Sequence, residues 1–346
     1  MATGEKSSIA KTDMITRTVA AEFSERIAAE RTRNRLVELG PLLIMFALII
    51  VMSVFVQGFF SWINLVGLLE QIATPLVLAM GLTFVLLLGS IDLSLEGVMG
   101  FTGSIVALLV LNTKSSLDLG TLGILIAVTV GTLFGIVSGT LHTRLRIPSF
   151  MVTFGMGSAV TGLGILSYRG IPASVKDPMF AYLAGGSFLG MPLLTWFALI
   201  IFFFALSIER YTAFGRHLYA IGENETMVRA TGIDVDRIKV VVFAWSAFCS
   251  SVAGVFGTIK LNIGQVIIAN GFLFSTITAV VVGGTSLVGG SGGVVQSLVG
   301  VVIVTIIQDS MVLLGVNAYV QPAVQGLIVI AAVSLTVARG KKLIFK

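Results

Sequence analysis

Two polar, glycine-rich interruptions hold the side chains of this sequence that could bind a solute. The first runs Gly89-Ser-Ile-Asp-Leu-Ser-Leu-Glu-Gly97, the second runs Gly283-Gly-Thr-Ser-Leu-Val-Gly-Gly-Ser-Gly-Gly293, and each breaks a long apolar run. Irregular backbone at membrane depth is tolerated only where protein or a water-filled cavity supplies its hydrogen bonds, and paired breaks of this kind often mark a transport pathway. We therefore expect both breaks to border a solute path, with tight surface turns as the alternative.

The candidate path residues are the hydroxyl and carboxylate groups of the breaks, namely Ser90, Asp92, Ser94, Thr285 and Ser286. An ionised Asp at the bilayer centre costs about 2.5–3.5 kcal/mol on insertion scales, so Asp92 must face water, a partner or the surface. Its carboxylate could accept the hydroxyls of a polyol, or it could cap a half-helix together with its serine neighbours. Both interpretations stay open at this point.

Other polar residues in the apolar runs are expected to pack rather than bind. Glu70, Gln71 and Asp309 are typical of satisfied polar groups between helices, and Cys249 stands alone in an apolar run. The two histidines lie in basic loops, and neither glycine-rich stretch has the Gly-Lys-Ser or Gly-Lys-Thr ending of a phosphate-binding loop. The sequence thus predicts no catalytic centre, no metal and no cofactor in this chain.

Composition places these residues in a membrane protein. Of the 346 residues, 56% are hydrophobic and 11% are charged, whereas soluble domains carry about a quarter charged residues. Apolar runs of about 20 residues recur, which is the length a helix needs to cross the hydrocarbon. Candidate spans lie near 41–60, 65–89, 97–112, 121–141, 149–167, 191–208, 240–259, 272–283, 294–313 and 320–338.

The predicted fold class is an all-α polytopic membrane protein of about ten transmembrane helices, some of them broken or short. Similar preludes, Thr83-Phe-Val-Leu-Leu-Leu and Thr278-Ala-Val-Val-Val, precede the two breaks and suggest two related halves. We divide the chain into a polar tail (1–40), a permease domain (41–338) and a basic tail (339–346). Within the domain, glycines at 131, 135 and 139 repeat at spacing four, which lets two helices approach closely.

The distribution of cations predicts the orientation. With both termini cytoplasmic, 18 of the 22 lysines and arginines fall on the cytoplasmic side, as the positive-inside rule requires. The net charge of +5 therefore reflects topology rather than nucleic-acid binding.

The connection 209–239 is the most informative loop. Asn224 is a suitable N-cap, Glu225 suits a first helical turn, Arg229 lies one turn further on, and Gly232 is a natural stop. A short amphipathic helix on the cytoplasmic face is predicted.

Four motifs in order resemble the ribose-type family of ABC transporter permeases, close to the branched-chain amino acid permease group. They are Phe214-Gly-Arg-His-Leu-Tyr-Ala-Ile-Gly-Glu-Asn and its continuation to Lys239, Gly89-Ser-Ile-Asp-Leu-Ser94, Ile147-Pro-Ser-Phe-Met-Val-Thr-Phe-Gly155, and Ala279-Val-Val-Val-Gly-Gly-Thr-Ser-Leu-Val-Gly-Gly290. The four motifs are spread over residues 80–335.

The resemblance implies a non-catalytic inner-membrane subunit that forms the path for a monosaccharide or related polyol. Its implied partners are a separate ATP-binding subunit, a periplasmic binding protein that delivers the solute, and a second permease chain. Residues 222–234 would form the coupling helix on the ATPase, with Gly222, Glu223, Asn224, Glu225, Arg229 and Gly232 as the coupling residues. The chain departs from the pattern at Glu223, Thr226 and Met227, which suggests tuned pairing with its ATPase.

Two other classes remain as alternatives. An ion-coupled secondary transporter would carry intramembrane ion or proton relays, for which Asp92, Glu96 and Asp309 are the only material. A channel would need a filter-like motif or a charged ring, and the sequence shows neither. Within the family, pentoses, hexoses, nucleosides, an autoinducer sugar and branched-chain amino acids all stay open as cargo, as do a permease homodimer and a heterodimer.

Overall fold

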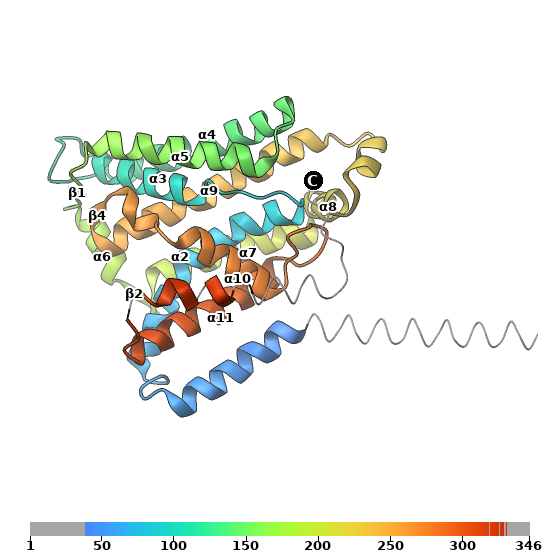
Figure 1. Cartoon of the computed structure of the whole chain (residues 1–346). Coiled ribbons are helices and arrows are strands. Elements are labelled where there is room, and N and C mark those ends of the chain that lie inside the picture. Colours follow the sequence, from blue (N-terminus) through green and yellow to red (C-terminus); the bar gives the residue numbers. More distant parts are fainter. Residues whose placement is uncertain (1–38, 318, 325, 329, 331–346) are drawn as a thin grey trace, which may run out of the picture.

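The computed structural model describes residues 39–317, 319–324, 326–328 and 330. It is a bundle of helices that run roughly side by side along one long direction (Figure 1). The kinked helix α8 (Ala213–Ala230) lies across one end of the bundle, and short strands lie at the other end. We call these the α8 end and the strand end.

Seven helical segments of the described residues are long and apolar enough to cross a membrane. They are α2 (Trp62–Leu87), α4 (Thr121–Leu145), α5 (Ser149–Tyr168), α7 (Leu193–Tyr211), α9 (Val235–Leu261), the segment Val266–Gly283, and α11 (Val294–Leu313). Two shorter apolar helices are Leu39–Phe55 and α3 (Leu95–Leu109). The chain is thus a multi-pass membrane protein, as predicted.

Each of the first nine predicted spans overlaps one of these helices, with shifted boundaries. The predicted span 272–283 corresponds to α10 (Phe272–Gly283). A 3-10 turn, η1 (Val266–Ala269), precedes it and lengthens the apolar segment on its N-terminal side. The last predicted span, 320–338, is described only in its first part. Of the predicted tail 1–40, residues 1–38 lie outside the described residues, and residues 39 and 40 belong to the helix Leu39–Phe55 rather than to a tail. The predicted tail 339–346 also lies outside the described residues.

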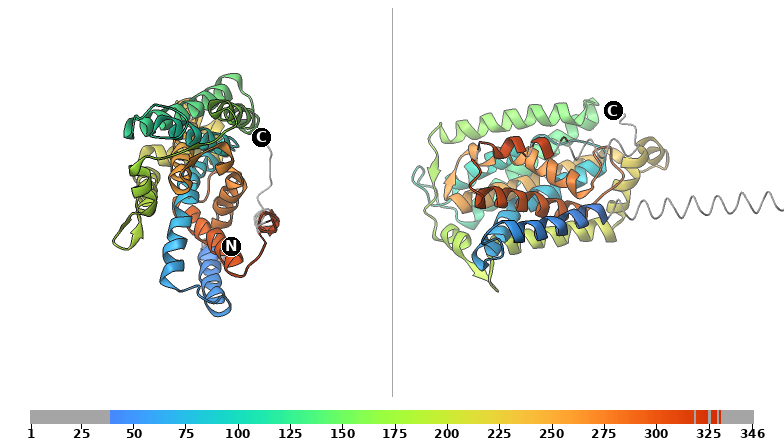
Figure 2. Two further views of the ribbon diagram at one scale, coloured as in Figure 1. Left: turned by 90° about the vertical axis from the view of Figure 1, so that its left-hand side faces the viewer. Right: turned by 60° about the horizontal axis from the view of Figure 1, so that its bottom comes forward.

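The strand end carries small elements that close the connections between helices. Strand β1 (Ala173–Ser174) pairs antiparallel with β4 (Ile263–Gly264), and β2 (Ser187–Phe188) pairs with β3 (Met191–Pro192). The short helix α6 (Pro178–Gly185) lies between β1 and β2. The views of Figure 2 show these elements at the end of the bundle away from α8.

Close glycine contacts hold α9 in the middle of the bundle. A Cβ at Gly135 of α4 would collide with the Phe243 carbonyl oxygen of α9, and one at Gly139 would lie 2.8 Å from the Val240 Cα. The predicted close approach of the glycine repeat is therefore confirmed, with α9 as the partner. On the α2 side, Gly81 packs against Cys249, which is fully buried as expected.

This packing gives a stability prediction. Gly135→Ala should lower stability by about 1–3 kcal/mol, because its methyl group has no room beside the α9 backbone. Gly162→Ala in α5 is the matched control, since nothing lies within 4 Å of that Cβ and alanine is the better helix former by about 1 kcal/mol. Thermal unfolding of the purified proteins in detergent measures both, and equal melting temperatures for the two variants would contradict the packing argument.

Candidate functional site

The first break connects α2 to the half-helix α3. Gly89 turns the chain with φ +72°, residues 90–94 form no helix, and α3 begins at Leu95. The Asp92 carboxylate accepts hydrogen bonds from the Ser94 amide (2.9 Å), the Ser94 hydroxyl (2.6 Å) and the Ser246 hydroxyl of α9 (2.7 Å). These bonds fix the start of α3 against α9.

The depth of Asp92 in the membrane can be estimated from the position of its partner Ser246 along α9. Ser246 lies eleven residues after Val235, the first residue of α9, which places it about 16 Å from that helix start at 1.5 Å per residue. The hydrocarbon core is about 30 Å thick, so Asp92 lies near mid-depth if α9 spans it. Its 1% exposure and three hydrogen bonds are what a carboxylate at that depth requires.

Side chains of α5 satisfy the remaining backbone of this break. The Ser149 hydroxyl accepts a hydrogen bond from the Ile91 amide at 3.1 Å, and the Thr153 hydroxyl accepts one from the Leu93 amide at 2.9 Å. An unpaired amide would be costly here, because no water is present in hydrocarbon to replace the bond. The irregular segment is therefore held on both sides.

The second break is a compact turn after α10. Gly284 ends the helix with φ +110°, and the Thr285 hydroxyl accepts a hydrogen bond from the Gly293 amide at 3.1 Å. The Ser286 hydroxyl accepts one from the Val288 amide at 3.2 Å. The polar side chains of the turn thus bond to its own backbone.

All five candidate path residues are buried in this structure. Their exposed fractions are 6% for Ser90, 1% for Asp92, 2% for Ser94, 1% for Thr285 and 8% for Ser286. The Asp92 carboxylate binds Ser94, the residue before α3, and no hydrogen bond from Asp92 to an amide of α3 itself is found among the described residues. Ser90, Asp92 and Ser94 precede α3, whereas Thr285 and Ser286 precede α11.

The two breaks meet each other and α8 at a set of glycines that we call the glycine junction: Gly89, Gly222, Gly289 and Gly290. The Leu87 carbonyl oxygen at the end of α2 accepts a hydrogen bond from the Gly290 amide at 3.0 Å. A Cβ at Gly222 of α8 would collide with both groups, and one at Gly289 would lie 2.7 Å from the Gly89 amide nitrogen. Three segments distant in sequence therefore touch through their backbones.

Glu209 is a site residue that the sequence analysis missed. Its carboxylate lies at the end of α7, is 8% exposed, and accepts the Val294 amide at the start of α11 at 3.1 and 3.2 Å. The Tyr219 hydroxyl of α8 lies between this carboxylate and the Gly292 carbonyl oxygen. Burial, the hydrogen bond to Glu209 and its negative charge raise the pKa of Tyr219, so the hydroxyl stays protonated. The signal in the sequence that could have identified Glu209 is a carboxylate at the C-terminal end of a long apolar run.

A short helix lies where the coupling helix was predicted (222–234), but it ends at Ala230 and is the second part of a longer element. The backbone of α8 kinks at Asn224 (φ −155°, ψ 92°), whose side chain accepts a hydrogen bond from the Met227 amide at 3.1 Å. Gly232 follows the helix with φ +84°. The N-cap and the stop are confirmed. The helical part before the kink, starting at Ala213, was not predicted.

The predicted limits of the connection at 209 and 239 were wrong. The final turn of α7 continues to Tyr211, and α9 already begins at Val235. The early start of α9 has a local cause, because the Asp234 side chain accepts a hydrogen bond from the Arg237 amide at 3.1 Å and so caps the helix.

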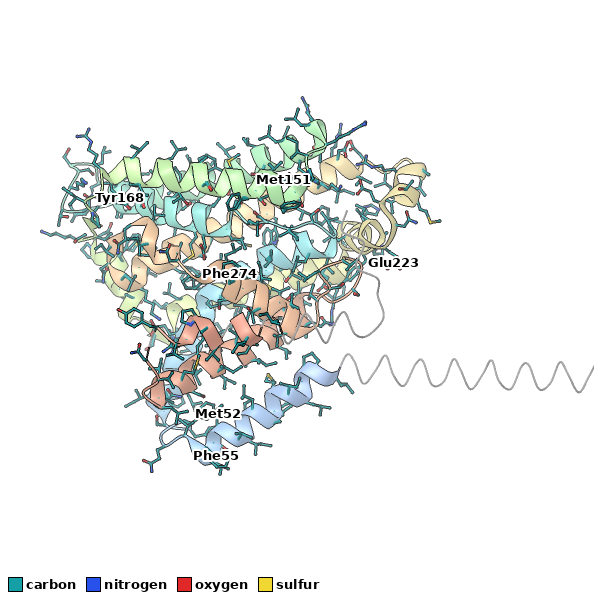
Figure 3. All side chains as sticks on the ribbon, viewed as in Figure 1. Met52, Phe55, Met151, Tyr168, Glu223 and Phe274 are labelled. Atoms are coloured by element: carbon teal, nitrogen blue, oxygen red, sulfur yellow. The ribbon has the colours of Figure 1, made fainter. Side chains whose placement is uncertain are left out.

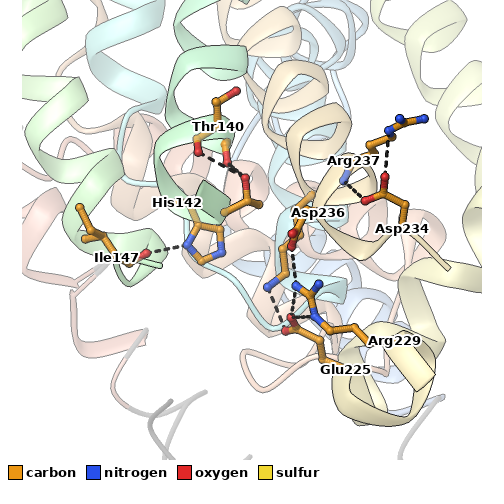
Figure 4. A network of polar contacts seen from close by, with 11 residues as sticks. Thr140, His142, Ile147, Glu225, Arg229, Asp234, Asp236 and Arg237 are labelled. Carbon is orange, nitrogen blue, oxygen red and sulfur yellow. Dashed lines mark hydrogen bonds and ion pairs between the residues drawn. The ribbon is translucent and has the colours of Figure 1, made fainter. Parts of the chain in front are cut away.

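An ion-pair network fixes the second part of α8 to α9 (Figure 4). Arg229 pairs with Glu225 at 2.8 Å and with Asp236, and the Lys239 ammonium lies 2.9 Å from Glu225. Burial by itself raises the pKa of Glu225, but the hydrogen bonds and positive charges of Lys239 and Arg229 outweigh burial and lower it. The hydrogen bond from Arg229 likewise lowers the pKa of Asp236.

Comparison with known proteins gives the family. The model of the family described as "Branched-chain amino acid transport system / permease component" matches residues 64–333, and the chain belongs to this family. The match includes both breaks, the glycine junction and α8. No solved structure matches the chain.

Named relatives cover nearly the whole chain. The ribose import permease protein RbsC of Haemophilus influenzae is 34% identical over 86% of this chain and 92% of its own length. RbsC of Bacillus subtilis is 32% identical over 86% and 92%. The L-arabinose ABC transporter permease protein AraH of Azospirillum brasilense is 33% identical over 89% and 91%.

The ion-pair network predicts a pH dependence. A carboxyl whose folded pKa is lowered stabilises the fold above its ordinary pKa, here 4.5, and loses that contribution as the pH falls through the lowered value. Glu225→Gln should therefore destabilise the protein at neutral pH, by about 0.5–1 kcal/mol because the network is partly exposed. Thermal unfolding at several pH values measures the difference from the wild type.

At a pH well below the lowered pKa, wild type and Glu225→Gln should unfold at the same temperature. Asp118→Asn, at the strand end, is the matched control and should behave like the wild type throughout. A gap between Glu225→Gln and wild type that is equally large at low and neutral pH would show that charge does not carry the effect.

Proposed function

We propose that this chain is the membrane-spanning permease subunit of an ATP-driven ABC importer and forms the translocation path for a monosaccharide or related polyol. The observation that carries the proposal is the match to ribose and arabinose permeases along nearly the full length of both chains. The description of the matching family, a transport permease component, independently supports the proposal. The chain itself would be non-catalytic, with ATP hydrolysed by a separate subunit.

The proposed topology has about ten spans, two related halves and both termini on the cytoplasmic side of the bacterial inner membrane. Its support is the cation bias, because Arg144, Arg146, Arg210, Arg216 and Arg237 all lie in connections or helix ends at the α8 end. The two halves share one device. In each, a turn containing glycine precedes a helix, and a carboxylate accepts an amide at or just before the helix start: Asp92 accepts the Ser94 amide before α3, and Glu209 accepts the Val294 amide of α11.

The second part of α8 is the proposed contact with the ATP-binding subunit. Glu223, Asn224, Arg229 and Gly232 are exposed at the end of the bundle, and Glu223 is labelled there in Figure 3. Gly222 and Glu225 face inward instead, Gly222 into the glycine junction and Glu225 towards Lys239. The six coupling residues thus divide into an outer surface and an inner attachment.

The proposed solute path passes beside the two breaks, with Ser90, Asp92, Ser94, Thr285 and Ser286 holding its walls in shape. Glycine-rich backbone with hydroxyl groups cannot face lipid, and a neutral polyol needs hydrogen-bonding walls. A periplasmic binding protein would deliver the solute at the strand end. Because one chain supplies one coupling helix, we propose that two copies pair around a two-fold axis.

ATP-driven uptake tests the proposal against an ion-coupled transporter. The chain is co-purified with its ATP-binding subunit and reconstituted in vesicles with its binding protein, D-ribose and L-arabinose. Uptake should require ATP on the side of the membrane where the ATP-binding subunit lies. It should continue after the proton gradient is collapsed. Uptake that ignores ATP and stops with the gradient would support the secondary transporter, and a complex with one copy of this chain beside a different permease would refute pairing.

Gly232→Val tests the coupling role in the same vesicles. The φ of +84° is strained for a β-branched residue, although nothing within 4 Å blocks the side chain. We expect solute-stimulated ATP hydrolysis and uptake to fall at least tenfold. Gly232→Asn is the matched control, because asparagine tolerates this conformation. Normal uptake by Gly232→Val would contradict the prediction, because it would show that coupling does not need this helix stop.

A further inference from the structure

The carboxylates within the described spans differ in how far their oxygens are satisfied. Asp92 accepts three hydrogen bonds, and Asp309 accepts the Asn64 and Gln71 side-chain amides at 3.0 and 3.2 Å. Glu70 pairs with a lysine near the strand end. Glu96 differs from them, because it is partly exposed and accepts one hydrogen bond from the described residues.

Glu96 joins the starts of two half-helices. It is the second residue of α3, and its Oε1 atom accepts a hydrogen bond from the Leu273 amide, in the first turn of α10, at 2.9 Å. The positive end of the α10 dipole favours a negative charge at this position. No described residue donates to Oε2, so this oxygen can accept a hydrogen bond from a ligand.

The depth of Glu96 decides what its exposed oxygen can face. The adjacent Gly97 packs against Gly157, which lies eight residues along α5 and hence about 12 Å from the start of that helix at the α8 end. This is well inside a hydrocarbon core of about 30 Å. A carboxylate facing lipid there would cost about 2.5–3.5 kcal/mol, so its exposed oxygen requires water, a solute or a second chain beside it rather than lipid.

An aromatic residue of α10 follows the amide that Glu96 binds. Phe274 directly follows Leu273 and is 68% exposed, although it sits between Glu223 at the α8 end and Tyr168 at the strand end (Figure 3). An aromatic face covers the C–H side of a sugar ring, and a carboxylate oxygen accepts its hydroxyl protons. The pair has the chemistry of a weak sugar contact rather than of a helix-packing contact.

We propose that Glu96, with Phe274 beside it, contacts the solute inside the path and discriminates among sugars by their hydroxyl pattern. This inference rests on the proposed function and names a residue of its path. The carboxylate Oε2 accepts one or more sugar hydroxyls while Oε1 keeps the residue in place on α10. A carboxylate that accepts a sugar hydroxyl favours that sugar over an analogue lacking the hydroxyl, because only the first sugar makes the bond.

The test compares initial uptake rates of D-ribose and 2-deoxy-D-ribose in the reconstituted importer, normalised to the loaded fraction of the binding protein. The wild type should prefer D-ribose, and Glu96→Gln should reduce the preference at least fivefold, because the amide keeps the size and the bond to Leu273 but is a weaker acceptor. Phe274→Ala should slow both sugars. Glu70→Gln is the matched control and should keep the wild-type ratio. A merely structural role would change both rates together and leave the ratio unchanged.

An unchanged ratio in Glu96→Gln, with the wild type active, would overturn the inference and leave the proposed function standing. A wild type that takes up neither sugar nor L-arabinose would overturn the proposed function and the inference with it. Access is measured independently with Glu96→Cys in a Cys249→Ser background. A small charged thiol reagent should label this cysteine, and D-ribose under turnover should slow the labelling. A cysteine that resists the reagent in every nucleotide state would also refute the contact.

Discussion

The close approach of three backbones at the glycine junction is the constraint on which the rest of this structure depends. Gly222 of α8 lies against the Leu87 carbonyl oxygen and the Gly290 amide, which are themselves hydrogen-bonded across the two breaks. No side chain larger than hydrogen fits at Gly222 without separating these segments. A displacement of α8 must therefore move the ends of α2 and α10 or break the contact. This makes the junction the shortest mechanical connection between the proposed ATPase contact and the solute path.

Carboxylates complete this connection at the starts of the half-helices. Glu209 bonds to the first amide of α11 and contacts Tyr219 of α8, while Asp92 bonds to the start of α3 and to α9. Both side chains place hydrogen-bond acceptors near a helix N-terminus, where backbone amides lack partners within the helix. The breaks are consequently ordered structures, although neither is regular helix. A path bordered by them can change shape only as these helix starts move.

Local signals let the sequence predict much of the fold and part of the site. Apolar length located the spans, the glycine repeat at 131–139 predicted a close helix contact, and Asn224 with Gly232 marked the two ends of a short helix correctly. The contacts that cross the fold could not be read in this way. Glu209 looked like the start of a loop, because its partner Val294 lies far along the chain. The same holds for the glycine junction, which needs the positions of three distant segments.

Replacing Gly222 tests the central claim most directly. In the reconstituted importer, uptake per ATP hydrolysed is measured for the wild type, for Gly222→Ala, and for Gly185→Ala, whose Cβ meets nothing within 4 Å. If α8 drives the breaks through the glycine junction, Gly222→Ala should assemble with the ATP-binding subunit and hydrolyse ATP, while uptake per ATP falls at least tenfold; Gly185→Ala should match the wild type. A Gly222→Ala complex with the wild-type ratio of uptake to hydrolysis would contradict the account.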